Sequence, residues 1–122
     1  MSRFVVLEHT WGTVHWDFML EVGGRLRTWA LSAPPDSQEP IAAECLPDHR
    51  PMYLDYEGPV SGDRGVVRRW DGGDYAAVQE GAERVSVRLR GMRLVGMAEL
   101  ERSQHAGSWV YRWRPAGADP EA

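Results

Sequence analysis

The amino-acid sequence predicts a mainly β fold, a compact antiparallel β-barrel of roughly eight strands with few short helices. Short runs rich in β-branched and aromatic residues recur along the chain, and clusters of Gly, Pro and Asp separate them. No long segment has the apolar periodicity of a helix. The length of 122 residues, without a repeat or linker, predicts one domain over residues 1–114 and a disordered tail over residues 115–122.

The first half of the chain supplies three segments with strand character. We expect strands at "RFVVLEH", "TVHWDFMLEV" and "RLRTWAL", with turns at "TWG" and at Gly23 and Gly24. The segment "APPDSQEP" must be a loop, because its prolines cannot take part in a central strand. The segment "IAAECL" fits either a strand or one helical turn.

The second half continues the same pattern. "GVVRRW" predicts a strand that ends at a turn, "DGGD", and "YAAVQEG" then resumes an extended chain. "RVSVRLRG" alternates apolar and polar residues and is the clearest half-buried strand. "RLVGMAELERS" and "SWVYRWRP" complete the series, so the whole chain favours an antiparallel barrel or sandwich.

Composition narrows the class of protein. The formal net charge of −4 disfavours a dedicated duplex-DNA binder but leaves room for a small basic site that takes one strand end. Six Trp residues suit either a small core or stacking on nucleobases. Cys45 is the single cysteine, which excludes an internal disulfide and disfavours a cysteine-built metal site. With no membrane-spanning apolar run and no signal-peptide pattern, we expect a cytoplasmic monomer.

The stretch "EHTWGTVHWDFMLE" concentrates the chemistry. Alternate side chains of a strand share a face, so Trp16, Phe18 and Leu20 form an apolar face. His15 and Asp17 lie together on the opposite face. A hairpin connection over residues 10–13 would return His9 close to His15.

Two imidazoles and a carboxylate on adjacent strands form half of an octahedral shell, which suits Mn, Fe or Zn and leaves positions for water and substrate. The alternative is a surface hydrogen bond between His15 and Asp17, and the residues alone leave both interpretations open. His105 lies in a polar loop, where we expect it to be solvated.

A second segment, "DHRPMYLDYEGP", contains His49 and Tyr53. A His and a Tyr aimed at a metal-bound phosphate can donate hydrogen bonds or protons. For Tyr56 we favour a packing role. For the three acids of the segment we expect turn chemistry or solvation: Asp48, Asp55 and Glu57.

Five ordered blocks of the sequence resemble a known family, the 3′-phosphoesterase domain of bacterial DNA ligase D. "RFVVLEHTWGTVHWDFMLE" is similar to that family's opening, RFVVQ-x-H-x5-H-[YF]-D-[FL]-R-L-E, and "GRLRTWAL" to its next segment. "DHRPMYLDYEGP" resembles D-H-P-x-x-Y-x-x-F-E-G, and "GVVRRWDGGDYAA" resembles G-x-V-x-x-W-D-x-G-x-Y. "RLVGMAELERS" with "SWVYRW" resembles the closing strands, so the resemblance extends from residue 3 to residue 113.

The resemblance implies a compact β-barrel with a crescent-shaped cleft and a divalent metal, Mn²⁺ by preference and Zn²⁺ as an alternative. His9, His15 and Asp17 match the family's metal ligands, and His49 and Tyr53 match its phosphate-contacting pair. The implied activity is trimming of DNA 3′ ends: removal of a terminal ribonucleoside to leave a 3′-phosphate, then removal of that phosphate. A nucleic-acid 3′ end and a ligase or other end-joining protein are the implied partners of what would be a freestanding domain.

The sequence also departs from the family. The family places an arginine two residues after the aspartate, where this chain has Met19, and another upstream of the D-H-P block, near Ile41. Methionine cannot replace the guanidinium fork that matches phosphate oxygens. Arg50, beside His49, and Arg64, in "SGDRG", are the candidate substitutes.

These observations predict a metal-dependent phosphoesterase. All three metal ligands are present, whereas both arginines that contact phosphate in the family are absent. Three alternatives stay open. The barrel can bind nucleic-acid ends or phosphorylated ligands without turnover, which the loss of the arginine motivates. The two-histidine, one-carboxylate set can hold Fe(II) in an oxygenase. The histidines can also be purely structural.

Overall fold

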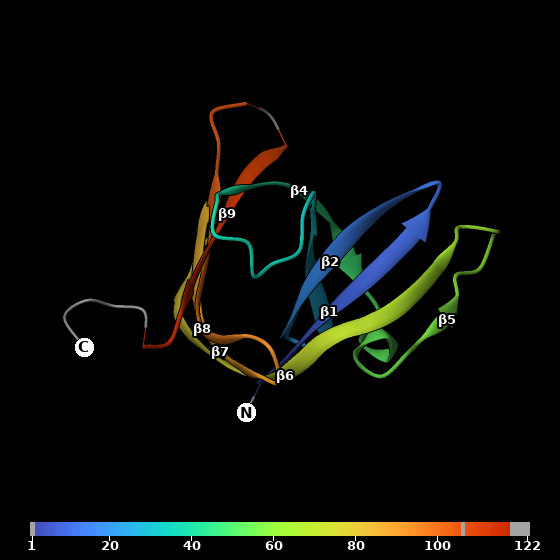
Figure 1. The fold of residues 1–122 in the computed structure, drawn as a ribbon, viewed down its shortest axis with the longest axis horizontal. Coiled ribbons are helices and arrows are strands. Elements are labelled where there is room, and N and C mark those ends of the chain that lie inside the picture. The colour runs from blue at the N-terminus through green and yellow to red at the C-terminus, as the bar shows by residue number, and fades with distance from the viewer. Residues whose placement is uncertain (1, 106, 118–122) are drawn as a thin grey trace.

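The computed structural model of the protein describes residues 2–105 and 107–117 (Figure 1). This part of the chain is built from strands, with one short 3-10 turn, η1. In chain order the elements are β1 Ser2–Trp11, β2 Thr13–Val22, β3 Arg25–Leu31, β4 Ile41–His49, η1 Pro51–Leu54, β5 Gly58–Pro59, β6 Val66–Glu80, β7 Arg84–Gly91, β8 Val95–Arg102 and β9 Ser108–Pro115.

The strands close into an antiparallel barrel, which confirms the predicted fold class. The hydrogen-bonded order is β1-β2-β3-β4-β9-β8-β7-β6, and β1 pairs with β6 to complete the circle. The short β5 adds to the outer end of β6 through Gly58 and Pro59. Closure leaves none of the eight barrel strands as a free edge.

The barrel interior is filled by large apolar side chains. On β1 and β2 the inward residues include Phe4, Phe18 and Leu20, each 1% exposed or less. Trp16 is partly buried and packs against the same cluster. The predicted apolar face of the second strand is therefore confirmed, and the other face of β1 and β2 points away from the barrel interior.

That outer face carries a second apolar cluster, which we call the Met19 cluster: Val5, Leu7, Met19, Leu26, Leu54 and Val67. The segment from η1 to β5 covers it, with Leu54 on η1 and Val60 just beyond β5 packed against it. Arg3 ties the end of η1 to β1, since its Nη2 lies 2.7 Å from Asp55 Oδ1. One outer face is thus apolar toward one end of the hairpin and polar toward the other.

The predicted turn at "DGGD" is wrong. Residues 66–80 form one continuous strand, β6, which pairs with β1 over its first part and with β7 over its second. A Cβ on Gly73 would lie 2.1 Å from the carbonyl oxygen of Arg90, so glycine here permits close strand approach rather than chain reversal. The Asp71 carboxylate accepts the backbone N–H groups of Met92, Arg93 and Leu94 in the β7–β8 connection.

The ambiguous segment "IAAECL" is the start of β4, and the proline-rich segment before it is a loop, as expected. Pro115 ends β9, and the Ala116 N–H donates to Val95 O, so the first residues of the predicted tail follow the sheet. Residues 118–122 lie outside the described residues, and the prediction of disorder remains untested there. Within the described ranges, no helix has the length and apolarity needed to cross a membrane.

Candidate metal centre

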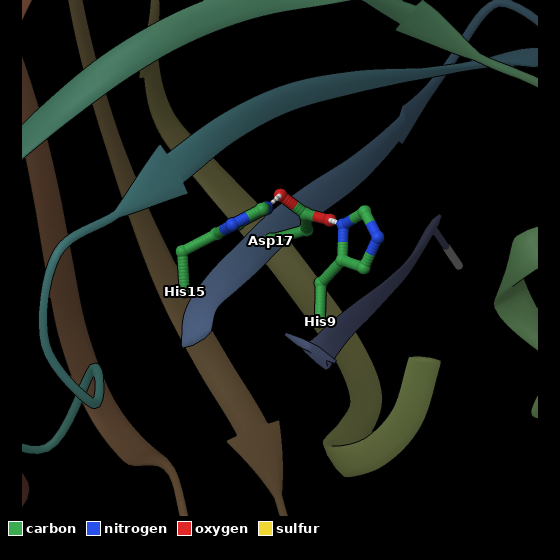
Figure 2. A group of neighbouring side chains, drawn as sticks. All are labelled: His9, His15 and Asp17. Atoms are coloured by element: carbon green, nitrogen blue, oxygen red, sulfur yellow. Dashed lines mark ion pairs between the residues drawn. The ribbon is translucent and has the colours of Figure 1, made fainter. Parts of the chain in front are cut away.

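The β1–β2 hairpin brings His9, His15 and Asp17 together, and we call these three residues the triad. The strands meet at a turn on Gly12, whose φ is +74°, so that His9 and His15 are direct cross-strand partners. Asp17 lies two residues farther along β2 and therefore on the same face as His15. One potential ligand atom from each residue lies within 4.8 Å of the others. Figure 2 shows the Asp17 carboxylate between the two imidazole rings.

Asp17 is the most enclosed member of the three. Its side chain is 4% exposed, whereas those of His9 and His15 are 14% and 29% exposed. Oδ2 lies 3.4 Å from His9 Nδ1, and Oδ1 lies 2.9 Å from His15 Nε2. Within the described part of the chain Oδ1 nevertheless lacks a well-aligned hydrogen bond. A buried carboxylate is costly unless its charge is compensated, and a divalent cation between it and the imidazoles would compensate that charge.

The backbone of the β5–β6 connection sets the tautomer of His9. His9 Nε2 lies 2.7 Å from the carbonyl oxygen of Arg64 and must donate, because a carbonyl oxygen only accepts. In the neutral ring this leaves the lone pair on Nδ1, which faces Asp17 and His15. A second partner that fixes the ring in this way is typical of histidine metal ligands.

Gly65 is what allows the Arg64 carbonyl to approach. Its φ is +81°, and a Cβ there would lie 2.0 Å from Thr10 O and 2.8 Å from Trp11 Cβ. Only glycine fits this contact with the end of β1. The loop "SGDRG", which we considered for its arginine, therefore contributes a backbone carbonyl and a glycine.

The electrostatics of the triad favour positive charge. The adjacent Asp17 carboxylate, as acceptor for the protonated ring, raises the pKa of His15 above its usual range despite the opposing effect of burial. The same negative field that stabilises a proton on His15 would stabilise a metal cation in its place. The residues present therefore fit a divalent metal.

His49 and Tyr53 lie beside the triad. His49 Nδ1 donates to Pro47 O at 2.9 Å, which leaves Nε2 available, and the His49 and Tyr53 ring centroids are 5.8 Å apart. His9, Asp17, His49 and Tyr53 share the lining of a cavity of about 40 Å³ with Met19 and other apolar residues. The structure therefore brings the three predicted metal ligands and the predicted phosphate-contacting pair into one region.

The other polar residues of this segment have structural contacts. Tyr56 packs edge-on against Tyr53 and donates its hydroxyl to Pro59 O, consistent with the packing role we expected. Asp55 pairs with Arg3, a contact that lowers the pKa of Asp55, and Glu57 accepts the backbone N–H of Arg69. These ion-pair and backbone contacts were not predicted. His105 is exposed, as expected.

The family arginine positions differ in their surroundings. Met19 is 1% exposed within the Met19 cluster, and Ile41 packs into the barrel interior, away from the triad. Of the proposed substitutes, Arg64 directs its guanidinium to Ser61. Arg50 lines a surface hollow with Tyr53 and Tyr56, and its side chain makes neither a hydrogen bond nor an ion pair with any described residue.

A larger hollow of about 530 Å³ also adjoins the triad, and we call it the Trp11 hollow. The three triad residues and His49 form part of its lining. Trp11, Glu44 and small or apolar residues of β3 and β4 form the rest of the lining. Sequence reasoning missed Trp11, Glu44 and Gly65; an aromatic residue in a turn between two candidate ligands was the available signal for Trp11.

Comparison with known proteins gives one family. The family model described as the DNA ligase D 3′-phosphoesterase domain matches residues 7–102. The multifunctional non-homologous end joining protein LigD of Pseudomonas aeruginosa is 32% identical over 132 residues, covering 100% of this chain and 16% of that protein. The chain thus spans a small part of the relative's length. The match supports a phosphoesterase-like function, and this chain belongs to the DNA ligase D 3′-phosphoesterase domain family.

Proposed function

We propose that this chain is a divalent-metal-dependent phosphoesterase that acts at nucleic-acid 3′ ends, removing a terminal ribonucleoside and then the 3′-phosphate. The observation that carries the proposal is the triad itself: a buried carboxylate between two imidazoles, whose Oδ1 lacks a well-aligned hydrogen bond, in the lining of an open hollow. Mn²⁺ suits this set and Zn²⁺ is the alternative. Family membership supports the reaction class.

His9, Asp17 and His15 would hold the cation through Nδ1, the carboxylate and Nε2. A bound divalent metal supplies polarisation of a phosphoryl oxygen and a lowered pKa for a coordinated water. His49, protonated at both nitrogens, can give the Nε2 proton to the leaving oxygen, while Nδ1 stays on Pro47 O. The Tyr53 hydroxyl can donate a hydrogen bond to a phosphoryl oxygen in the same region.

Arg50 is the better candidate for an anion contact than Arg64. Its guanidinium is free to reach a substrate, whereas that of Arg64 is held on Ser61. One exposed arginine binds phosphate more weakly than two enclosed arginines do, because solvent screens the charge of an exposed guanidinium. We therefore expect weaker phosphate binding than in family members that have both arginines.

The test is a primer–template whose strand ends in a 3′-ribonucleotide, incubated with Mn²⁺ and resolved by length. Wild type should give the shortened strand with a 3′-phosphate, and His15→Ala should reduce the rate at least about 100-fold. His105→Ala, an exposed histidine outside the triad, is the matched control and should behave as wild type. Equal product from wild type and His15→Ala would refute catalysis by this site.

A non-catalytic end-binding module is the second candidate, and the burial of Met19 at a family arginine position favours it. The same substrate distinguishes the two. Mn²⁺-dependent retention in a gel shift, without product after prolonged incubation at saturating metal, would support binding alone. A ligase or other end-joining protein as physical partner also remains a proposal, testable by co-purification with purified candidates.

A further inference from the structure

The Trp11 hollow has a composition that suits an uncharged ligand. Its volume of about 530 Å³ lies within the usual range of small-molecule sites. Ala30, Leu31, Ala43 and Leu46 give it apolar walls. Its described lining residues include the acids Asp17 and Glu44 and no arginine, and the chain has no lysine. A phosphate group would be repelled from this side except where the metal neutralises Asp17.

The hollow next to Tyr53 differs in charge. Arg50 lines it, together with Tyr53, Tyr56 and Ser61. The Arg50 hollow shares Tyr53 with the small cavity that His9 and Asp17 line, so a cationic hollow and an acidic, apolar hollow both adjoin the region of the triad. A strand whose scissile phosphate sits at the triad would place its next phosphate toward Arg50. The terminal nucleoside, which carries no further phosphate, would occupy the Trp11 hollow.

Trp11 supplies a surface for a base. Its side chain is 57% exposed at the tip of the β1–β2 hairpin, which is unusual for so large an apolar group. The Trp11 indole is inclined by only 15° to the His9 imidazole, and the two ring centroids are 6.4 Å apart, so the two rings are nearly parallel. An exposed aromatic plane beside a phosphate site can stack on a nucleobase of any sequence.

We infer that the Trp11 hollow binds the terminal nucleoside that leaves during cleavage, with its base stacked on Trp11. This rests on the proposed function. In the reaction a water molecule releases a proton to solvent as its oxygen bonds to phosphorus, and the P–O5′ bond breaks. The departing oxygen takes a proton from His49, the nucleoside leaves with a 5′-hydroxyl, and the strand keeps its 3′-phosphate. Glu44, at the hollow, is placed to accept a hydrogen bond from a ribose hydroxyl.

The experiment compares Trp11→Ala and Trp11→Phe with wild type on three strand ends: a 3′-ribonucleotide, a 3′-terminal ribose that lacks its base, and a 3′-phosphate. Trp11→Ala should raise KM about tenfold on the ribonucleotide end and leave KM unchanged on the other two. Trp11→Phe should recover most of the loss. Met92→Ala, a 92% exposed apolar residue in the β7–β8 connection, is the matched control.

Two outcomes overturn the inference. One is an unchanged KM for Trp11→Ala on the ribonucleotide end. The other is an equal loss on the end that lacks a base, which would assign Trp11 to the hairpin structure. Mn²⁺ affinity and melting temperature, measured on each variant, verify that the triad and fold are intact.

A binding measurement separates this inference from the proposed function. If wild type cleaves none of the strands, the proposed function fails, but adenosine titrated into the Mn²⁺-free protein still tests the hollow by NMR. Shifts of the backbone amide resonances of Ala30, Ala43 and Leu46, which line the hollow, that are present in wild type and lost in Trp11→Ala support the nucleoside site. The absence of any shift in wild type overturns it.

Discussion

Asp17 and Met19 lie two residues apart on one face of β2, yet their surroundings are opposite in character. Asp17 is a buried carboxylate between two imidazoles, and Met19 is enclosed by aliphatic side chains. The ligand set depends on strand register, which the hairpin fixes through the pairing of His9 with His15. A phosphate clamp depends on the identity of one side chain. A single substitution can therefore remove an anion contact while the arrangement of His9, His15 and Asp17 persists.

Met19→Arg should have the largest effect on stability. A guanidinium placed among apolar residues without a partner should lower the free energy of unfolding by on the order of 3 kcal/mol. Mn²⁺ with inorganic phosphate should recover part of that loss, because ligand binding to the native state stabilises it. Chemical denaturation with and without both ligands measures this.

Met19→Leu is the matched control for volume and should cost less than about 1.5 kcal/mol. If Met19→Arg is as stable as wild type in the absence of ligands, the apolar enclosure of this position is wrong. If phosphate gives it no added protection, an arginine here does not reach the anion.

Gly65→Ala should have the next largest effect. The new Cβ would meet Thr10 O at 2.0 Å in a backbone of positive φ, so the loop must shift and carry the Arg64 carbonyl away from His9. We expect a loss of about 2 kcal/mol in the free energy of unfolding. Mn²⁺ affinity should fall about tenfold, as is usual when a partner of a ligand is lost.

Gly62→Ala is the matched control, because Gly62 has a similar φ of +76° and an added Cβ would be 3.5 Å from its nearest neighbour, Arg64 Nε. Gly62→Ala therefore has the conformational cost of a side chain at positive φ but no steric clash, and it should leave Mn²⁺ affinity unchanged. Equal losses of metal affinity in both variants would show that loop conformation in general, rather than the Arg64 contact, matters.

The smallest expected effect is a dependence of stability on pH. The folded-state pKa of His15 is raised, so its stabilisation of the metal-free protein is complete below the unfolded value of about 6.5. It is lost as pH rises through the folded-state pKa. Mn²⁺ requires the deprotonated ring, so the increase in melting temperature caused by Mn²⁺ should grow with pH.

Melting curves between about pH 5 and pH 8, in EDTA and in Mn²⁺, measure both trends. His15→Gln should reduce the pH dependence of the melting temperature in EDTA. It should also reduce the growth, with rising pH, of the increase in melting temperature caused by Mn²⁺. Stabilisation by Mn²⁺ that weakens as pH rises would contradict the assignment of His15 as a ligand.

Much of the fold followed from local sequence pattern. The spacing of Trp16, Phe18 and Leu20 at every second position correctly assigned an inward apolar face, because a strand has only two faces. The pattern failed at Gly72 and Gly73: glycine at position 73 permits close packing of β6 on β7, and an added Cβ on Gly72 would meet the Arg69 guanidinium. Local sequence does not distinguish a glycine needed for a turn from one needed for a neighbour's backbone.

The candidate site was predictable to the extent that it is local. His9, His15 and Asp17 lie in one hairpin, so spacing alone brought them together. The contact of His9 with the Arg64 carbonyl spans 55 residues and involves a backbone atom, which no residue type signals. The hollow beside Trp11 depends on the path of β3 and β4, and its existence could not be inferred from the hairpin sequence.

Binding of a divalent metal by the β1–β2 hairpin can be measured by Mn²⁺ titration followed by electron paramagnetic resonance. Wild type should bind one Mn²⁺ per chain. Asp17→Asn, which keeps the shape but removes the charge, should lower the affinity at least about 100-fold while the metal-free protein stays folded. Wild type that binds neither Mn²⁺ nor Zn²⁺, or equal Mn²⁺ affinity in the two proteins, would contradict the account.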